Sequence, residues 1–111
     1  MPDPKPAYAI ADKLVVAQGK DVRATLMTFE FGQEIPWHSH THVTDSSFCL
    51  EGAVEIAFRG PDETRVLGCG EWLQATVGRA HRVRCLGPGP CRVLLVQGVG
   101  EYDFVPQPQT P

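Results

Sequence analysis

Eight short segments rich in β-branched and aromatic residues, separated by turns that contain glycine or proline, constrain the fold of this chain more than any other feature. No window of the sequence has a convincing apolar period of 3.6 residues, so helices are not expected. Short runs of this kind at near-regular spacing predict an all-β protein, either a sandwich or a small barrel. The predicted strands are residues 13–18, 22–31, 46–52, 53–58, 64–68, 71–77, 81–87 and 91–98.

The segment 81–87 carries the clearest information about which side chains face inward. His81, Val83 and Cys85 alternate with two arginines. Because successive side chains of a strand point to opposite faces, His81 should lie on the same buried face as the apolar residues.

The length of the chain and the composition of its two ends indicate how many domains it has and where they end. A chain of 111 residues fits one compact domain, so we expect residues 1–111 to form a single domain. Both ends are proline-rich, with "MPDPKP" at the start and "VPQPQTP" at the finish. Proline lacks the backbone N–H that helices and sheet interiors use, so both ends are interpreted as extended tails.

Charge and hydropathy exclude several classes of partner. The formal net charge is −3 and the arginines are scattered, which gives no general attraction to nucleic acid or to anionic lipid. No stretch approaches the roughly 18 consecutive apolar residues of a membrane span. A small-molecule substrate is therefore the expected partner.

The four cysteines indicate a compartment. They form no CxxC pair, and the N-terminus has no basic segment followed by an apolar run. We therefore expect a cytoplasmic protein whose thiols are free.

A histidine cluster is the main chemical feature of the chain. His38, His40 and His42 lie within five residues, and Asp45 follows. Residues i and i+2 of an extended segment project from one face, so His38 and His40 aim two imidazoles at one point. The inward-facing His81 is a candidate third ligand and Asp45 a candidate carboxylate ligand for a divalent metal. The alternatives left open are an exposed polar loop for the cluster and a hydrogen-bonded core histidine for His81.

The glycines around this cluster carry a family resemblance. Gly32, five residues, His38-x-His40, four residues, Asp45, six residues and Gly52 resembles the first motif of the cupin family, G(X)5HXH(X)3-4E(X)6G. Asp45 stands where the family usually has glutamate. Its side chain is one methylene shorter, which leaves open whether it binds a metal directly.

A second segment resembles the second cupin motif, G(X)5PXG(X)2H(X)3N. Gly70 is followed by seven residues and Gly78, then by two residues and His81. Thr76 replaces the usual proline and Cys85 the usual asparagine. Neither replaced position is a metal ligand in the family, so the three-histidine assignment is unaffected.

The resemblance implies a fold and a type of site. The fold is a single small jelly-roll β-barrel, and the site is a divalent metal ion, Mn, Fe, Ni or Zn, held by His38, His40 and His81 with Asp45 as fourth ligand. Such a site implies an enzyme of the dioxygenase type or of the isomerase or lyase type, acting on a small organic molecule. The alternative is a non-catalytic module that binds or senses a metabolite. A homodimer is also expected by resemblance.

Two further residues are candidates for catalysis. His42 has a side chain whose reference pKa suits a base or proton shuttle, although a solvent-facing loop residue is the competing interpretation. Arg79 precedes His81 by two residues and could bind a substrate carboxylate with both arms of its guanidinium, although an exposed, solubilising arginine is the favoured interpretation. Tyr102 and Phe104 are interpreted as an apolar anchor for the C-terminal tail.

Overall fold

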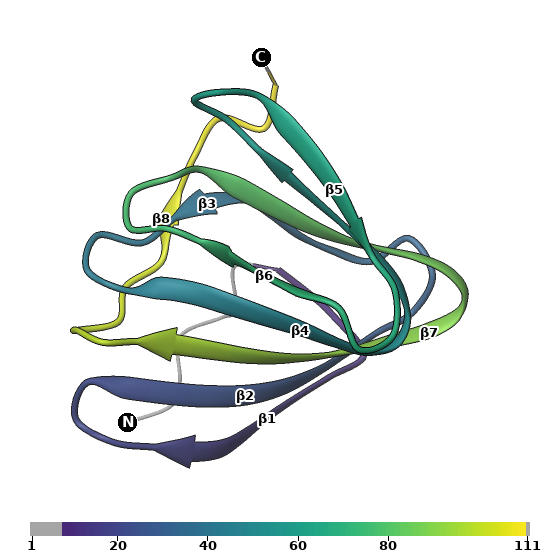
Figure 1. Cartoon of the computed structure of the whole chain (residues 1–111), viewed down its shortest axis with the longest axis horizontal. Coiled ribbons are helices and arrows are strands. Elements are labelled where there is room, and N and C mark those ends of the chain that lie inside the picture. The colour runs from purple at the N-terminus through teal and green to yellow at the C-terminus, as the bar shows by residue number, and fades with distance from the viewer. Residues whose placement is uncertain (1–7, 111) are drawn as a thin grey trace.

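A computed structural model of the chain describes residues 8–110. Every strand pair in it is antiparallel, which confirms the all-β prediction (Figure 1). The part of the chain that is described contains no helix, and so none long and apolar enough to cross a membrane. The N-terminal "MPDPKP" lies outside the described residues. The strands are β1 (Asp12–Gln18), β2 (Val22–Phe29), β3 (Glu34–Ser39), β4 (Thr44–Phe58), β5 (Glu63–Leu67), β6 (Trp72–Ala75), β7 (His81–Gly98) and β8 (Val105–Pro106).

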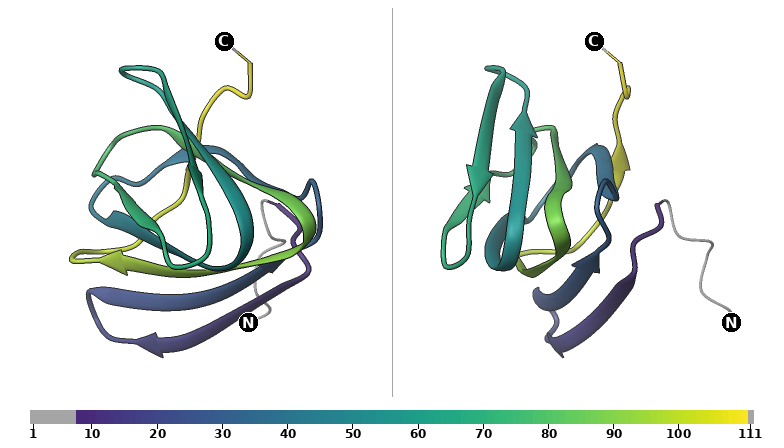
Figure 2. Two further views of the ribbon diagram at one scale, coloured as in Figure 1. Left: turned by 45° about the vertical axis from the view of Figure 1, so that its right-hand side comes forward. Right: turned by 90° about the vertical axis from the view of Figure 1, so that its right-hand side faces the viewer.

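Two long strands, β4 and β7, join the two layers of the barrel. The first part of β4 and the last part of β7 pair with each other and are flanked by β6 on one side and by β2 and β1 on the other. The last part of β4 and the first part of β7 pair in the second layer, between β5 and the pair β3 and β8. The two strands bend together from one layer into the other (Figure 2). This is the jelly-roll barrel that the resemblance implied.

Each of these long strands was predicted as two. Residues 46–52 and 53–58 form one strand, β4, and residues 81–87 and 91–98 form one strand, β7. Gly52 in β4 and the segment 87–90 in β7, interpreted from the sequence as turns, lie at the bends where these strands pass from one layer to the other. At one bend, Gly52 has a φ of 78°, and a Cβ atom there would lie 2.7 Å from Sγ of Cys91. Only glycine fits that position.

The expectation of free thiols is wrong for two of the four cysteines. Cys85 and Cys91 form a disulfide across the bend of β7, with their Cα atoms 5.8 Å apart. Cys49 and Cys69 are free. The pairing was not predicted because it depends on the bend, which turns two inward-facing cysteines of one strand toward each other.

The core fills the space between the two layers. His81, Val83 and Cys85 are all buried on one face of β7, as the alternation predicted. From the other layer, Met27 and Phe29 of β2 are completely or almost completely buried. Polar side chains are buried among them at one end of the barrel, where the candidate site lies.

Two strands were not predicted. β3 contains Pro36, a residue that cannot donate a ladder hydrogen bond, yet the strand pairs with the first part of β7. β8 lies in the segment interpreted as a tail, and its pairing with β3 sets Pro106 opposite His38. The C-terminal segment therefore docks on the barrel of its own chain and adds a short strand next to the histidines.

Candidate metal centre

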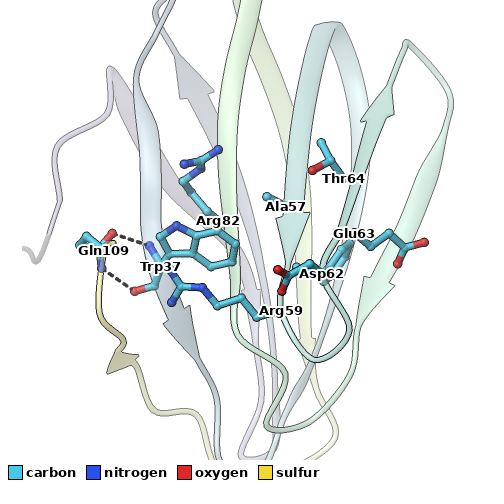
Figure 3. Close-up of a pocket in the computed structure, with 9 residues that line it drawn as sticks. Trp37, Ala57, Arg59, Asp62, Glu63, Thr64, Arg82 and Gln109 are labelled. Atoms are coloured by element: carbon cyan, nitrogen blue, oxygen red, sulfur yellow. Dashed lines mark hydrogen bonds between the residues drawn. The ribbon is translucent and has the colours of Figure 1, made fainter. Parts of the chain in front are cut away.

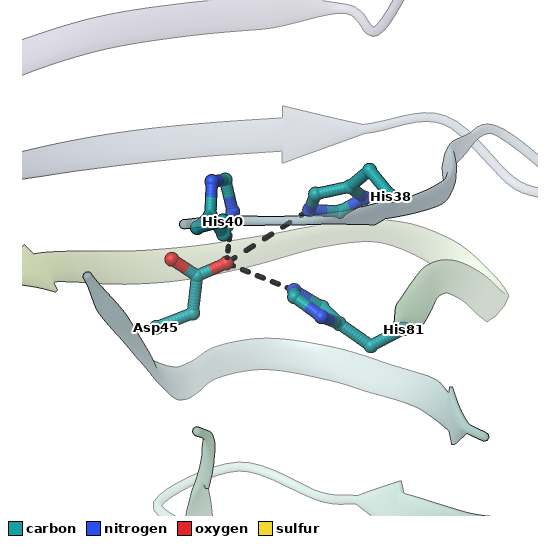
Figure 4. A group of neighbouring side chains, drawn as sticks. All are labelled: His38, His40, Asp45 and His81. Atoms are coloured by element: carbon teal, nitrogen blue, oxygen red, sulfur yellow. Dashed lines mark hydrogen bonds and ion pairs between the residues drawn. The ribbon is translucent and has the colours of Figure 1, made fainter. Parts of the chain in front are cut away.

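The structure brings the four predicted ligands together. His38, His40, Asp45 and His81 are all buried, and one ligand atom from each lies within 4.8 Å of the others (Figure 4). Oδ2 of Asp45 lies 2.9 Å from Nε2 of His40 and 2.9 Å from Nε2 of His81. Nε2 of His38 is 3.9 Å from the same oxygen.

Strand pairing explains why residues so far apart in the chain meet. His38 of β3 is the register partner of His81 at the start of β7. His40 follows β3 by one residue and projects, as His38 does, toward the carboxylate. Asp45 lies on the inward face of β4, and its register partner across the sheet is Gln97 of β7. The site thus uses both layers of the barrel.

The outer nitrogen of each imidazole is held by a backbone carbonyl. Nδ1 of His38 lies 2.7 Å from the carbonyl oxygen of Pro36, and Nδ1 of His81 lies 2.9 Å from that of Arg79. Nδ1 of His40 contacts the carbonyl oxygen of Asp103. A carbonyl oxygen only accepts hydrogen bonds, so each Nδ1 must carry a proton and donate it. In the neutral imidazole, Nε2 is then left with a free lone pair that points at the centre of the cluster.

This donor set fits a metal cation. Three imidazole lone pairs and a carboxylate oxygen face one another, and such acceptors repel unless a cation or a proton lies between them. Metal-bound histidines typically donate their other N–H to a carbonyl or carboxylate, as all three do here. The residues present therefore suit a divalent metal ion.

The pKa shifts reflect the same arrangement of side chains. Burial opposes the charge on Asp45, but its contacts with His38, His40 and His81 outweigh burial and hold the pKa of the carboxyl well below its usual range. Burial lowers the pKa of His38 below its ordinary value. Burial also acts against a charged His40, yet Asp45 and the carbonyl of Asp103 raise its pKa. The carboxylate is thus ionised and ready to bind a cation.

Gln97 is a site residue that the sequence analysis missed. Its Nε2 donates a hydrogen bond to Oδ1 of Asp45 at 3.0 Å, which leaves Oδ2 directed at the histidines. Gln97 is almost fully buried on the inward face of β7. The signal was a polar residue at an inward position of an alternating strand, two residues after Leu95.

The segment after β7 covers the histidines. The ring of Phe104 stacks on His38 with centroids 4.6 Å apart, and the ring of Tyr102 lies 5.5 Å from that of His40. Asp103, between them, accepts hydrogen bonds from the backbone N–H and the hydroxyl of Thr41 through its carboxylate. The aromatic residues predicted to anchor the tail therefore also shield the site.

His42 and Arg79 lie outside the four-residue cluster. His42 is exposed in the loop after β3. The guanidinium of Arg79 stacks over Phe58 and donates hydrogen bonds to the carbonyl oxygens of Arg59 and Pro61. The backbone of Arg79 does serve the site, since its carbonyl accepts the proton of His81. Among the described residues, neither side chain contacts His38, His40, Asp45 or His81.

A separate cavity lies on the outer face of the β3, β4 and β5 layer. It has a volume of about 320 Å³, and the Trp37 indole forms one wall (Figure 3). The guanidinium carbons of Arg59 and Arg82 lie 3.9 and 5.4 Å from the Trp37 ring centroid. Gln109 holds the backbone of Trp37 through two hydrogen bonds, which fasten the C-terminal segment to β3.

Comparisons with known proteins agree with this fold. The family model described as "Cupin domain" matches residues 25–97. An uncharacterised conserved protein with a double-stranded beta-helix domain from Klebsiella pneumoniae is 25% identical, with a TM-score of 0.77 over 92% of this chain and 83% of that chain. TT1209 from Thermus thermophilus is 27% identical, with a TM-score of 0.73 over 79% of this chain and 82% of that chain.

A third similar structure shows the fold alone. KdgF from Halomonas sp. is 22% identical, with a TM-score of 0.68 over 83% of this chain and 87% of that chain. A search of curated proteins finds no match.

Proposed function

Because this chain belongs to the cupin family, we propose that it is a metal-dependent enzyme that acts on a small organic molecule at the His38, His40, Asp45 and His81 centre. The observation that carries this proposal is the convergence of three Nε2 lone pairs, each fixed by a carbonyl at Nδ1, on one ionised carboxylate. Nothing but a cation or a proton satisfies that set of acceptors.

A bound divalent metal would supply Lewis-acid chemistry on a carbonyl or hydroxyl, or a binding position for dioxygen. The protein's own contribution is positioning. The three carbonyl contacts set the ring orientations, Gln97 sets the orientation of Asp45, and Tyr102 and Phe104 limit the access of water. Imidazole and carboxylate ligands suit Mn, Fe, Ni and Zn alike, so the ligand set supports both a dioxygenase and an isomerase or lyase.

A non-catalytic binding or sensing module is the second candidate. It is favoured by the burial of the site, since all four ligand residues are at most 3% exposed. A metal ion held in such a buried site would exchange slowly, which suits a permanent part of a metabolite-binding module.

The first experiment is metal analysis of the purified protein and of a His38→Ala/His40→Ala variant, with His42→Ala as the matched control. We expect nearly one equivalent of metal in the wild type and in the control, and almost none in the double variant. Equal metal content in all three proteins would refute the site.

The second experiment separates the reaction types. Oxygen uptake by the metal-loaded protein is measured with catechols, flavonols, thiols and β-diketones. Uptake with one of these classes supports a dioxygenase. Turnover of a sugar or keto acid without uptake supports an isomerase or lyase, and saturable binding without turnover supports the sensing module.

A further inference from the structure

A small cavity lies next to the metal centre, between the turn that joins β1 to β2 and the segment that follows β7. Its volume is about 40 Å³, and Lys20, Arg23, Gln97 and Tyr102 are among the residues that line it. A space of that size accommodates one or two water molecules or a group of the size of a carboxylate.

The lining of this cavity carries positive charge. Lys20 and Arg23 both contribute to it, and no Asp or Glu is among its lining residues in the described part of the chain. Two cations that line the same cavity favour an anion in the space between them.

Arg23 has a guanidinium N–H group without a hydrogen-bond partner among the described residues. Its Nη2 donates to Oε1 of Gln97 at 3.0 Å, and its guanidinium carbon lies 3.7 Å from the centroid of the Tyr102 ring. The unpaired group is Nε, which is buried. Unpaired buried polar groups are costly, so their presence points to a ligand that pairs with them.

Gln97 connects this cavity to the metal ligands. The same amide that accepts from Arg23 donates to Oδ1 of Asp45 at 3.0 Å. One amide group therefore separates the guanidinium from the carboxylate of the candidate metal ligand.

We propose that the cavity at Arg23 and Lys20 binds the carboxylate of the substrate, so that the substrate class is a small organic acid. This inference rests on the proposed function, because it assigns a second contact to the same substrate. Arg23 binds the carboxylate, and Lys20 adds charge at the outer end of the cavity.

The test compares succinate with succinamide, its neutral diamide of similar size, as probes of the metal-loaded protein. Binding is followed by the backbone amide NMR signals of Gly19 and Gly100, and the metal content of each sample is measured in parallel. Succinate should bind and succinamide should bind much more weakly. Arg23→Gln should weaken succinate binding about 10- to 100-fold, the range for a charge-assisted hydrogen bond, with little effect on succinamide.

Two further variants keep the test decisive. Lys20→Gln, at an exposed turn residue, should weaken succinate binding about two- to fivefold even if the Arg23 variant does not fold. Arg92→Gln, which removes a charge from an exposed position of β7, should leave binding unchanged.

Equal binding of the two probes to the wild type, or unchanged succinate binding in both the Arg23 and Lys20 variants, would overturn the inference while leaving the metal site intact. A wild-type protein without metal would instead refute the proposed function. Succinate binding to such a protein that depends on Arg23 would still support an anion site.

Discussion

Nε2 of His81, the first residue of β7, lies 2.9 Å from Oδ2 of Asp45 in β4, although 36 positions separate the two residues in the chain. Both side chains are almost fully buried. The Nδ1 proton of His81 is donated to the carbonyl of Arg79, so Nε2 faces the carboxylate with a lone pair. Such a pair is stable only with a cation or a second proton between the two groups. The predictions on metal binding follow from this contact.

Loss of one ligand should weaken metal binding strongly. Substituting an outer partner of a metal ligand typically costs about 10- to 100-fold in affinity, so His81→Ala should lower the affinity by more than about 100-fold. Asp45→Asn keeps the hydrogen-bonding shape but removes the charge, and should lower the affinity about 10- to 100-fold. Competition with a chromogenic chelator measures both. Wild-type affinity in either variant would contradict the assignment, and His42→Ala is the matched control.

Metal affinity should fall as the solution becomes more acidic. The raised pKa of His40 means that its Nε2 holds a proton up to a higher pH than a free imidazole, whose pKa is about 6.5. That proton occupies the lone pair that the metal needs. Below the pKa of His40, affinity should therefore drop about tenfold per pH unit for each displaced proton, and it should level off above that pKa. Affinity that stays constant from about pH 5.5 to 8 would rule out competition at the histidines.

The aromatic cover should control metal release. Phe104 is half-buried and stacks on His38 and against Tyr8. Phe104→Ala should lower the free energy of unfolding by about 1–2 kcal/mol, less than for a fully buried ring, and should speed removal of the metal by a chelator. Denaturant unfolding and stopped-flow chelation measure the two effects. Val99→Ala, at a residue that is 78% exposed, should change neither. An unchanged release rate in the Phe104 variant would contradict the shielding role.

The disulfide should be measurable by thiol titration. The oxidised protein, unfolded without reductant, should show two reactive thiols, from Cys49 and Cys69, and reduction should raise the number to four. Cys85→Ser/Cys91→Ser should lower the free energy of unfolding by about 2 kcal/mol, because the cross-link closes a short loop. Cys69→Ser should change stability by less than about 0.5 kcal/mol. Four reactive thiols before reduction would show that the bond does not form.

A second copy of the chain should cover β1. Leu14, Val15 and Val16 of this strand are 53%, 43% and 52% exposed, and the described residues pair the strand only with β2. Exposed apolar side chains on an edge strand favour pairing with another chain. We expect a dimer in analytical ultracentrifugation and a monomer for Leu14→Asp/Val16→Asp. Val66→Asp, a charge placed on exposed β5, should leave the dimer intact. A monomeric wild type would end this proposal.

The candidate metal ligands were predictable because their signals are local or follow fixed spacing. The i, i+2 relation places His38 and His40 on one face, and alternation in residues 81–87 places His81 inward. The resemblance to the first cupin motif, carried by Gly32 and Gly52, implied Asp45 as the fourth position. These rules require no knowledge of which strands pair.

The partners of those ligands were not predictable in the same way. Asp103 reaches His40 only because β8 pairs with β3, and Gln97 reaches Asp45 only because β4 and β7 are in one register. Strand pairing between distant segments depends on the packing of the whole barrel, and turn signals do not specify it.

The amino-acid pattern alone therefore established an all-β chain with an inward histidine and a metal-ligand spacing. Folding decided the rest: the bends that merge predicted strands into β4 and β7, the disulfide across one bend, and the polar contacts that orient each ligand. The physical reason is that alternation and spacing act over a few residues, whereas these contacts join segments that meet only when the two layers of the barrel close on each other.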